Sequence, residues 1–176
     1  VNTLGVKKVF QLVLGAGQQN YTFDIAGFGK VAMINFVQDQ VGATNYTVET
    51  KELGYIPSVP GSVYDQNAIS ELPGFPGVTF AHGSTTATDD ATISMTQTSS
   101  TTFSNVSNVP DTGDFTFSTI GWGYFDESDV FVGTGADLGN SVTFALKGTK
   151  DRVLKVEFVN TLGVKKVFQL VLGAGQ

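Results

Sequence analysis

The chain begins and ends with the same eighteen residues. The sequence VNTLGVKKVFQLVLGAGQ occupies residues 1–18 and returns without a change at residues 159–176, which is 158 positions later. Two independent segments of this length and mixed composition do not match by chance, and mutation would have blurred an old duplication. The match therefore indicates a recent or enforced duplication, an engineered graft, or one period of a tandem array with an overlap at its ends.

Each copy has the pattern of a β-strand with one mostly apolar face. The apolar positions of that face are Val6, Phe10, Leu12 and Leu14 in the first copy and Val164, Phe168, Leu170 and Leu172 in the second. Just before the second copy, apolar residues again alternate with charged ones, at Leu154, Val156 and Phe158. The four residues Asn-Thr-Leu-Gly at 160–163 are typical of the turn of a β-hairpin. The sequence therefore predicts that residues 152–158 pair with the second copy.

The first copy also has a local partner, because a Gly-rich turn at residues 15–19 leads into an alternating segment at residues 21–25. A single sandwich offers one natural position for this strand, so one copy is surplus. Burying its four apolar side chains contributes on the order of 6–12 kcal/mol, and we expect the surplus strand to join the sheet of a neighbouring molecule. Head-to-tail polymerisation follows, unless the repeats form a covalent tandem array in which the shared strand is the joint.

Size and composition favour one all-β domain. Its 176 residues fit a single domain, which we divide into a first joining strand (1–18), a β-sandwich body (19–158) and a second joining strand (159–176). About nine to eleven short strands separated by turns predict a β-sandwich of jelly-roll or Greek-key type. Residues 53–77 hold four of the five prolines and are interpreted as a long loop that crosses between sheets.

Charge and composition narrow the classes of partner. A formal net charge of −6 with no basic stripe disfavours nucleic acid. The chain has no cysteine, and its longest apolar run, residues 9–17, is too short to cross a bilayer, so no membrane insertion is expected. It begins with Val rather than Met, which we interpret as a mature or excerpted form that suits an extracellular or cell-surface protein.

Few residues indicate chemistry. His82 is the only histidine and no Gly-x-Ser-x-Gly motif accompanies it, so an enzyme is not expected. Asp126 and Asp129 lie in an acidic turn whose oxygens suit calcium. Their spacing matches no defined calcium loop, and a solvated turn is the alternative. No other cofactor is expected.

Two further sets of residues suggest glycan chemistry. Trp122 and Tyr124 are flanked by glycines and form a candidate site for stacking on a sugar ring, although a core tryptophan is the alternative. Asn20, Asn45 and Asn105 each begin an Asn-x-Ser/Thr motif for N-glycosylation. In a Thr-rich chain, three such motifs are near the number that chance gives.

Together these features predict a structural subunit of an extracellular filament or of a repetitive cell-surface protein. Its partners would be copies of itself, joined head to tail by strand donation or as a tandem array. The alternative is a carbohydrate- or ligand-binding β-sandwich module of a bacterial or archaeal adhesin, which would bind surface glycans.

Overall fold

A computed structural model describes residues 10–13, 19–50, 63–65, 78–83, 91–99, 101–148 and 152–172. Side chains are described for residues 20–50, 91–99, 101–148 and 153–170. Within these ranges the chain forms strands and turns and contains no helix, as the sequence predicts. The described residues accordingly include no helix that could span a bilayer.

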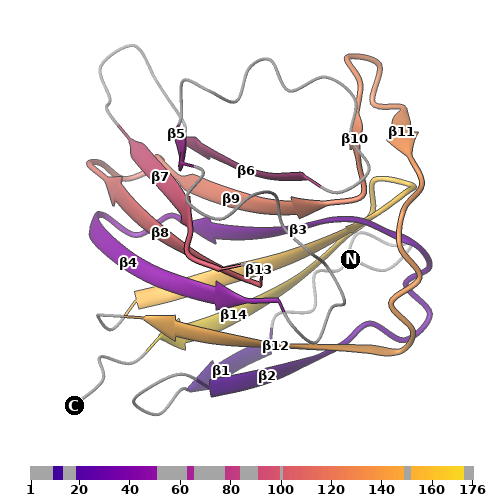
Figure 1. The fold of residues 1–176 in the computed structure, drawn as a ribbon, viewed down its shortest axis with the longest axis horizontal. Coiled ribbons are helices and arrows are strands. Elements are labelled where there is room, and N and C mark those ends of the chain that lie inside the picture. The colour runs from indigo at the N-terminus through magenta and orange to yellow at the C-terminus, as the bar shows by residue number, and fades with distance from the viewer. Residues whose placement is uncertain are drawn as a thin grey trace.

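The first sheet has six strands in the order β1-β14-β13-β3-β9-β6 (Figure 1). Their bounds are β1 (Phe10–Val13), β3 (Val31–Gln38), β6 (Val78–Gly83), β9 (Thr116–Gly121), β13 (Arg152–Asn160) and β14 (Lys165–Leu172). All neighbouring strands are antiparallel except β1 and β14, which are parallel. The two strands that come from the repeat are therefore neighbours at one end of this sheet.

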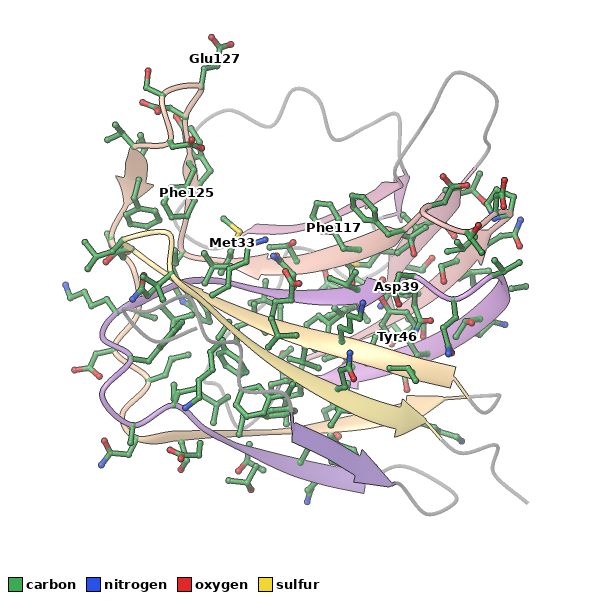
Figure 2. All side chains as sticks on the ribbon, turned by 180° about the vertical axis from the view of Figure 1, so that it is seen from behind. Met33, Asp39, Tyr46, Phe117, Phe125 and Glu127 are labelled. Carbon is green, nitrogen blue, oxygen red and sulfur yellow. The ribbon has the colours of Figure 1, made fainter. Side chains whose placement is uncertain are left out.

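The second sheet also has six strands, in the order β2-β12-β4-β8-β7-β5, and is antiparallel throughout. Its strands are β2 (Gln19–Asp24), β4 (Gly42–Glu49), β5 (Val63–Asp65), β7 (Thr92–Gln97), β8 (Thr102–Val109) and β12 (Ser141–Gly148). A separate hairpin joins β10 (Gly123–Phe125) to β11 (Phe131–Gly133). Figure 2 shows this hairpin extending from the sheets, with Glu127 at its tip.

The two large sheets share one buried cluster of apolar side chains, an arrangement consistent with the predicted β-sandwich. The described part of the chain forms fourteen strands, compared with the nine to eleven expected. Part of the difference is β5, a three-residue strand within the segment interpreted as a crossover loop. Proline and glycine signals predicted a loop there, but pairing with β7 decides the conformation of residues 63–65.

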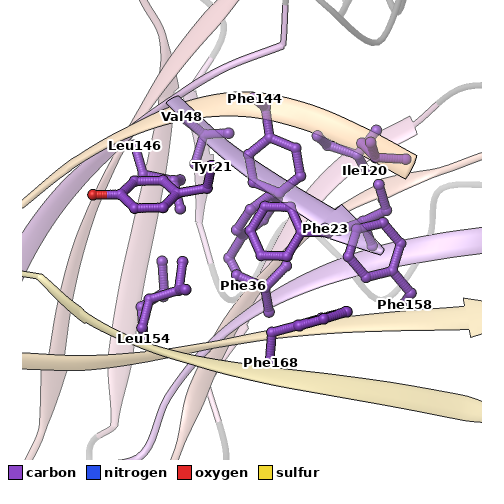
Figure 3. Close-up of a cluster of buried hydrophobic side chains, with 14 of the residues drawn as sticks. Tyr21, Phe23, Phe36, Val48, Ile120, Phe144, Leu146, Leu154, Phe158 and Phe168 are labelled. Carbon is purple, nitrogen blue, oxygen red and sulfur yellow. The ribbon is translucent and has the colours of Figure 1, made fainter. Parts of the chain in front are cut away.

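One half of the interior is aromatic. Phe23 of β2 stacks on Phe144 of β12 with ring centroids 4.7 Å apart, and it meets the edge of Phe168 of β14 at 5.1 Å (Figure 3). Phe158 of β13 lies 5.7 Å from Phe168, and Phe36 of β3 lies 5.4 Å from Phe144. These five rings, which we call the aromatic half, fill the space between the two sheets on the side of the repeat strands.

The other half of the interior contains many polar side chains. Seven of them, each at most 1% exposed, form what we call the polar seam: Gln38, Thr44, Tyr46, Asn105, Ser107, Thr116 and Ser118. Tyr46 of β4 links the two sheets, because its hydroxyl donates to the carbonyl oxygen of Phe36 at 3.2 Å and lies 3.2 Å from the hydroxyl of Ser118. The seam lies between the two sheets, under β4 and β8 of one and β3 and β9 of the other, on the side away from the repeat.

Candidate functional site at the edge that carries the repeat

The hairpin between β13 and β14 is fixed by the first residues of the second copy. The Asn160 side chain is 7% exposed, and its Oδ1 accepts hydrogen bonds from the backbone N–H groups of Leu162 (3.0 Å) and Val164 (2.9 Å). Its Nδ2 donates to the carbonyl oxygen of Phe28 at 2.9 Å. Gly163 has a φ of +75°, which favours glycine. The predicted hairpin is confirmed, and Asn160 ties its turn to the chain before β3.

The second copy supplies an integral strand of the core. Phe168 and Leu170 are 4% and 0% exposed and pair with Val156 and Leu154 of β13. Leu154, Val156 and Phe158 are themselves completely buried. The alternation of the sequence therefore describes β13 and the middle of β14 correctly.

Two predicted positions of the second copy lie at the limits of β14. Val164 is 40% exposed, because it belongs to the hairpin turn before the strand begins, and its expected place on the buried face is wrong. Leu172 ends β14, and its side chain lies outside the described residues.

The first copy lies next to its own duplicate. β1 pairs with β14 in parallel, and each residue faces its equivalent: Phe10 with Phe168, Gln11 with Gln169, Leu12 with Leu170 and Val13 with Val171. Val6 and Leu14 lie outside the described residues. Because β1 is the outermost strand of the first sheet, the second copy occupies the position inside the sheet and the first copy occupies its edge.

Along residues 168–171, β14 is paired on both sides, with β13 on one and β1 on the other. A strand has only two hydrogen-bonding edges. In a tandem array with a shared strand, β14 of one unit would also serve as β1 of the next unit. It would then need three neighbours, so the observed pairing cannot be repeated along such an array.

Lysines of β13 and β14 make ion pairs on the outer face near this edge. Lys165 lies 3.5 Å from Glu157 of β13, and Lys155 of β13 pairs with Asp39. Lys166 lies 5.8 Å from the centre of the Phe168 ring. These partly exposed pairs orient the side chains more than they stabilise the fold.

Trp122 is partly buried and packs against the core cluster. Its backbone N–H donates a hydrogen bond to the carbonyl oxygen of Ala32 at 2.8 Å. A Cβ on Gly123 would come within 2.5 Å of Phe131, so this glycine permits close packing of the β10–β11 hairpin rather than the approach of a ligand. Tyr124 is 41% exposed on β10. The structure therefore gives Trp122 the contacts of a core tryptophan at a bend between strands.

The three glycosylation motifs differ in exposure. Asn20 and Asn45 are exposed, whereas Asn105 is 0% exposed in the polar seam. A glycan on Asn105 is incompatible with the folded chain, because the amide lies between the sheets. The motif alone does not show that Asn105 is buried, because the alternation of β8 turns its side chain inward together with those of Phe103 and Ser107.

The acidic turn uses one carboxylate to hold its own backbone. Asp126 Oδ1 accepts hydrogen bonds from the N–H groups of Ser128 and Val130, each at 2.9 Å. Asp129 has a φ of +59° and its N–H donates to the carbonyl oxygen of Asp126. Among the described residues, no group of three or more His, Cys, Asp or Glu side chains could hold a metal ion.

The parallel register of β1 and β14 was not predicted from the sequence. A groove on the outer face of the first sheet was not predicted either. Both depend on which strands become neighbours, and alternation within one strand carries no such signal. The chain matches no protein-family model, no curated protein sequence and no solved structure.

Proposed function

We propose that the protein is a structural subunit that assembles with copies of itself by passing β1 to the β14 edge of a neighbouring molecule. One observation carries the proposal. The same strand is present twice, the second copy fills the core position, and the first copy is held at the edge through parallel pairing of four residues.

Exchange of β1 between molecules keeps the pairing that exists within one chain. Residues 10–13 would meet residues 168–171 of the next molecule in the same parallel register. Only the connection between β1 and β2 needs a different path, which is the situation in which domain swapping costs little. Reciprocal exchange closes a dimer, whereas exchange in one direction gives an open chain of subunits.

Edge pairing favours exchange between separate chains over a covalent array. Separate chains each bring their own β1 and β14, so every β14 keeps two neighbours. In a shared-strand array, a single strand would have to be β14 of one unit and β1 of the next. It would then need more neighbours than its two hydrogen-bonding edges allow. We therefore propose a non-covalent homopolymer, extracellular or on the cell surface, as the form that this chain builds.

We also propose that the sandwich is of jelly-roll type. Consecutive strands β2, β3 and β4 alternate between the two sheets, and β2 packs through Phe23 on Phe158 of β13 and Phe168 of β14. This alternation places both ends of the body, β2 and β13, near the edge that carries the repeat. An experimental structure of the assembled protein is the test of the strand order.

Engineered disulfides test the exchange directly, because the chain has no cysteine of its own. Gln11 and Gln169 are paired positions, and neighbouring strands hold their Cα atoms within the span of a disulfide. A Gln11→Cys variant mixed with a Gln169→Cys variant under mild oxidation should give a covalent heterodimer whose yield rises with protein concentration. A mixture of Gln11→Cys with Lys147→Cys, an exposed position on β12 of the other sheet, is the matched control.

The alternative outcome is equally clear. If the mixture gives no more heterodimer than the control at any concentration, while the Gln11→Cys/Gln169→Cys double variant closes within one chain, β1 stays in its own molecule and the proposal is wrong. Deleting residues 1–18 should leave a monomer by light scattering. Electron microscopy of the undeleted protein then separates closed dimers from open filaments.

A further inference from the structure

A groove of about 490 Å³ lies on the outer face of the first sheet. Two cross-strand rows form its floor. One row consists of Glu157 and Asn35, and the next consists of Lys155, Val37 and Phe117. The turn before β9 forms a side wall with Asp114 and Phe115. The volume falls within the range of sites for small molecules.

The floor contains a fixed and buried amide. Asn35 is only 8% exposed, and its Oδ1 accepts a hydrogen bond from the Thr119 hydroxyl at 2.7 Å. This bond sets the orientation of the amide, so its Nδ2 is the group left to donate. No described group accepts a hydrogen bond from Nδ2, and Asn35 lines the groove. Nδ2 is not one of the buried side-chain atoms that lack a partner, so it reaches the groove and can donate to a ligand oxygen there.

One wall is aromatic and exposed. Phe115 and Phe117 are nearly parallel, with an angle of 21° between their planes and 6.2 Å between ring centres. Phe115 keeps 38% of its surface exposed on a side of the sheet that faces away from the core. Figure 2 shows Phe117 and Asp39 on this side of the molecule. Two such rings offer a flat apolar surface to the face of another ring.

The charges in the groove are mostly paired within the protein. Lys155 pairs with Asp39 and Lys165 pairs with Glu157, so both ammonium groups already have a carboxylate partner. A strongly anionic ligand would meet the carboxylates, and a strongly cationic one would meet the lysines. The pairs nevertheless present oxygen acceptors and N–H donors, which suit hydroxyl groups because a hydroxyl both donates and accepts.

We propose that this groove binds a neutral saccharide, with a pyranose ring against Phe115 and Phe117 and its hydroxyl groups on Asn35 and the two ion pairs. The site differs from the Trp122 and Tyr124 position suggested by the sequence, and it is independent of the strand exchange proposed above. A filament with this property would carry one such groove on each subunit.

Saturation-transfer NMR on the full chain tests the proposal, since it detects weak ligands of monomers and assemblies alike. The probes are glucose, galactose, mannose and N-acetylglucosamine and their β-1,4-linked disaccharides at millimolar concentration. At least one probe should show transfer that does not change between low and high salt. Phe115→Ala should weaken that binding by about tenfold, whereas Phe115→Tyr, which keeps the ring, should retain it.

Tyr124→Ala is the matched control, because Tyr124 is a comparably exposed aromatic residue on a different surface. Its binding should equal that of the unmodified protein. The proposal is overturned if no probe shows transfer, or if Tyr124→Ala abolishes transfer while Phe115→Ala does not. Assembly should be the same in all these variants, so failure of sugar binding and failure of strand exchange are distinguishable.

Discussion

The aromatic half and the polar seam fill the same sandwich by different means. In the aromatic half, five phenylalanine rings from β2, β3, β12, β13 and β14 touch in a network with centroid distances from 4.7 to 5.7 Å. In the polar seam, hydroxyl and amide groups lie between the sheets, and Tyr46 is the link that spans them. Close packing stabilises the aromatic half. In the polar seam, by contrast, buried polar atoms of Gln38, Thr44, Asn105 and Thr116 have no hydrogen-bond partner among the described groups.

This difference shows that the repeat strand contributes to the stability of only one half of the interior. β14 delivers Phe168 and Leu170 to the aromatic half, so this strand is part of the side of the molecule that burial stabilises most. The polar seam does not involve the repeat. We therefore expect substitutions in the second copy to lower stability strongly, and substitutions in the seam to have smaller effects that depend on polarity.

The largest expected effect is that of Phe168→Ala. Removing this ring from its contacts with Phe23 and Phe158 should lower the free energy of unfolding by about 3–5 kcal/mol. Phe10→Ala is a matched control, since it makes the same change in the same local sequence at the edge strand. Urea denaturation of both variants should give a much smaller loss for Phe10→Ala. Equal losses would show that the two copies contribute equally to the core.

The next effect concerns the hairpin that leads into β14. Asn160→Ala removes three hydrogen bonds, to the N–H groups of Leu162 and Val164 and to the carbonyl oxygen of Phe28. At about 0.5–1.5 kcal/mol for each bond, the free energy of unfolding should fall by about 1.5–4.5 kcal/mol. Asn2→Ala, the same change in the first copy, separates a role in the turn from a role of the repeat sequence. A loss below 0.5 kcal/mol for Asn160→Ala, on the order of one weak hydrogen bond, would contradict the role of Asn160 in the turn.

A third test compares the halves by making the seam more apolar. Asn105 is completely buried, and neither polar atom of its amide has a hydrogen-bond partner among the described groups. Asn105→Leu should therefore raise the free energy of unfolding, by about 1 kcal/mol, because a desolvated amide is replaced by an apolar group. Thermal unfolding measures the change. A clear decrease would show that the amide is satisfied in the folded protein and that the seam is a cooperative network.

The smallest effect is one of pH. Burial raises the pKa of Tyr46 above its ordinary value of 10.0, although the hydrogen bond with Ser118 acts in the opposite direction. Above pH 10 the unfolded chain loses a proton that the folded chain retains, so the free energy of unfolding should fall as the pH rises. Below pH 10 the proton is bound in both states, and Tyr46 adds no pH dependence there. Tyr46→Phe should reduce this alkaline loss. A smaller part should remain, because burial also raises the pKa of Tyr21. An unchanged alkaline profile would place the titrating group elsewhere.

Much of the fold was predictable from local alternation. β13 and β14 and their turn followed from apolar residues at every second position and from Asn160 and Gly163. The sequence of β3 has apolar residues on both faces, which is typical of a central strand, and its neighbours are β13 and β9. The three-residue strand β5 was not predicted, because a segment that short takes its conformation from the strand beside it.

The candidate sites were less predictable, because they depend on register. Alternation showed that the chain has one strand too many, yet it could not show that β1 pairs in parallel with its duplicate. Asn35 and Glu157 are far apart in sequence, and only the antiparallel pairing of β3 with β13 brings them together. The Asn105 motif failed for a related reason, since three letters do not report which way a strand residue points.

If subunits exchange β1 as proposed, the identical sequences of β1 and the middle of β14 give the polymer a built-in means of controlling length. A free peptide with the sequence of residues 1–18 would present the same four residues to an exposed β14 edge, but it would carry no sandwich behind them for the next subunit to join. It would act as a chain terminator, and the average length of the polymer would depend on the ratio of peptide to subunit. Proteolytic release of that segment from some subunits would set filament length without any change to the fold.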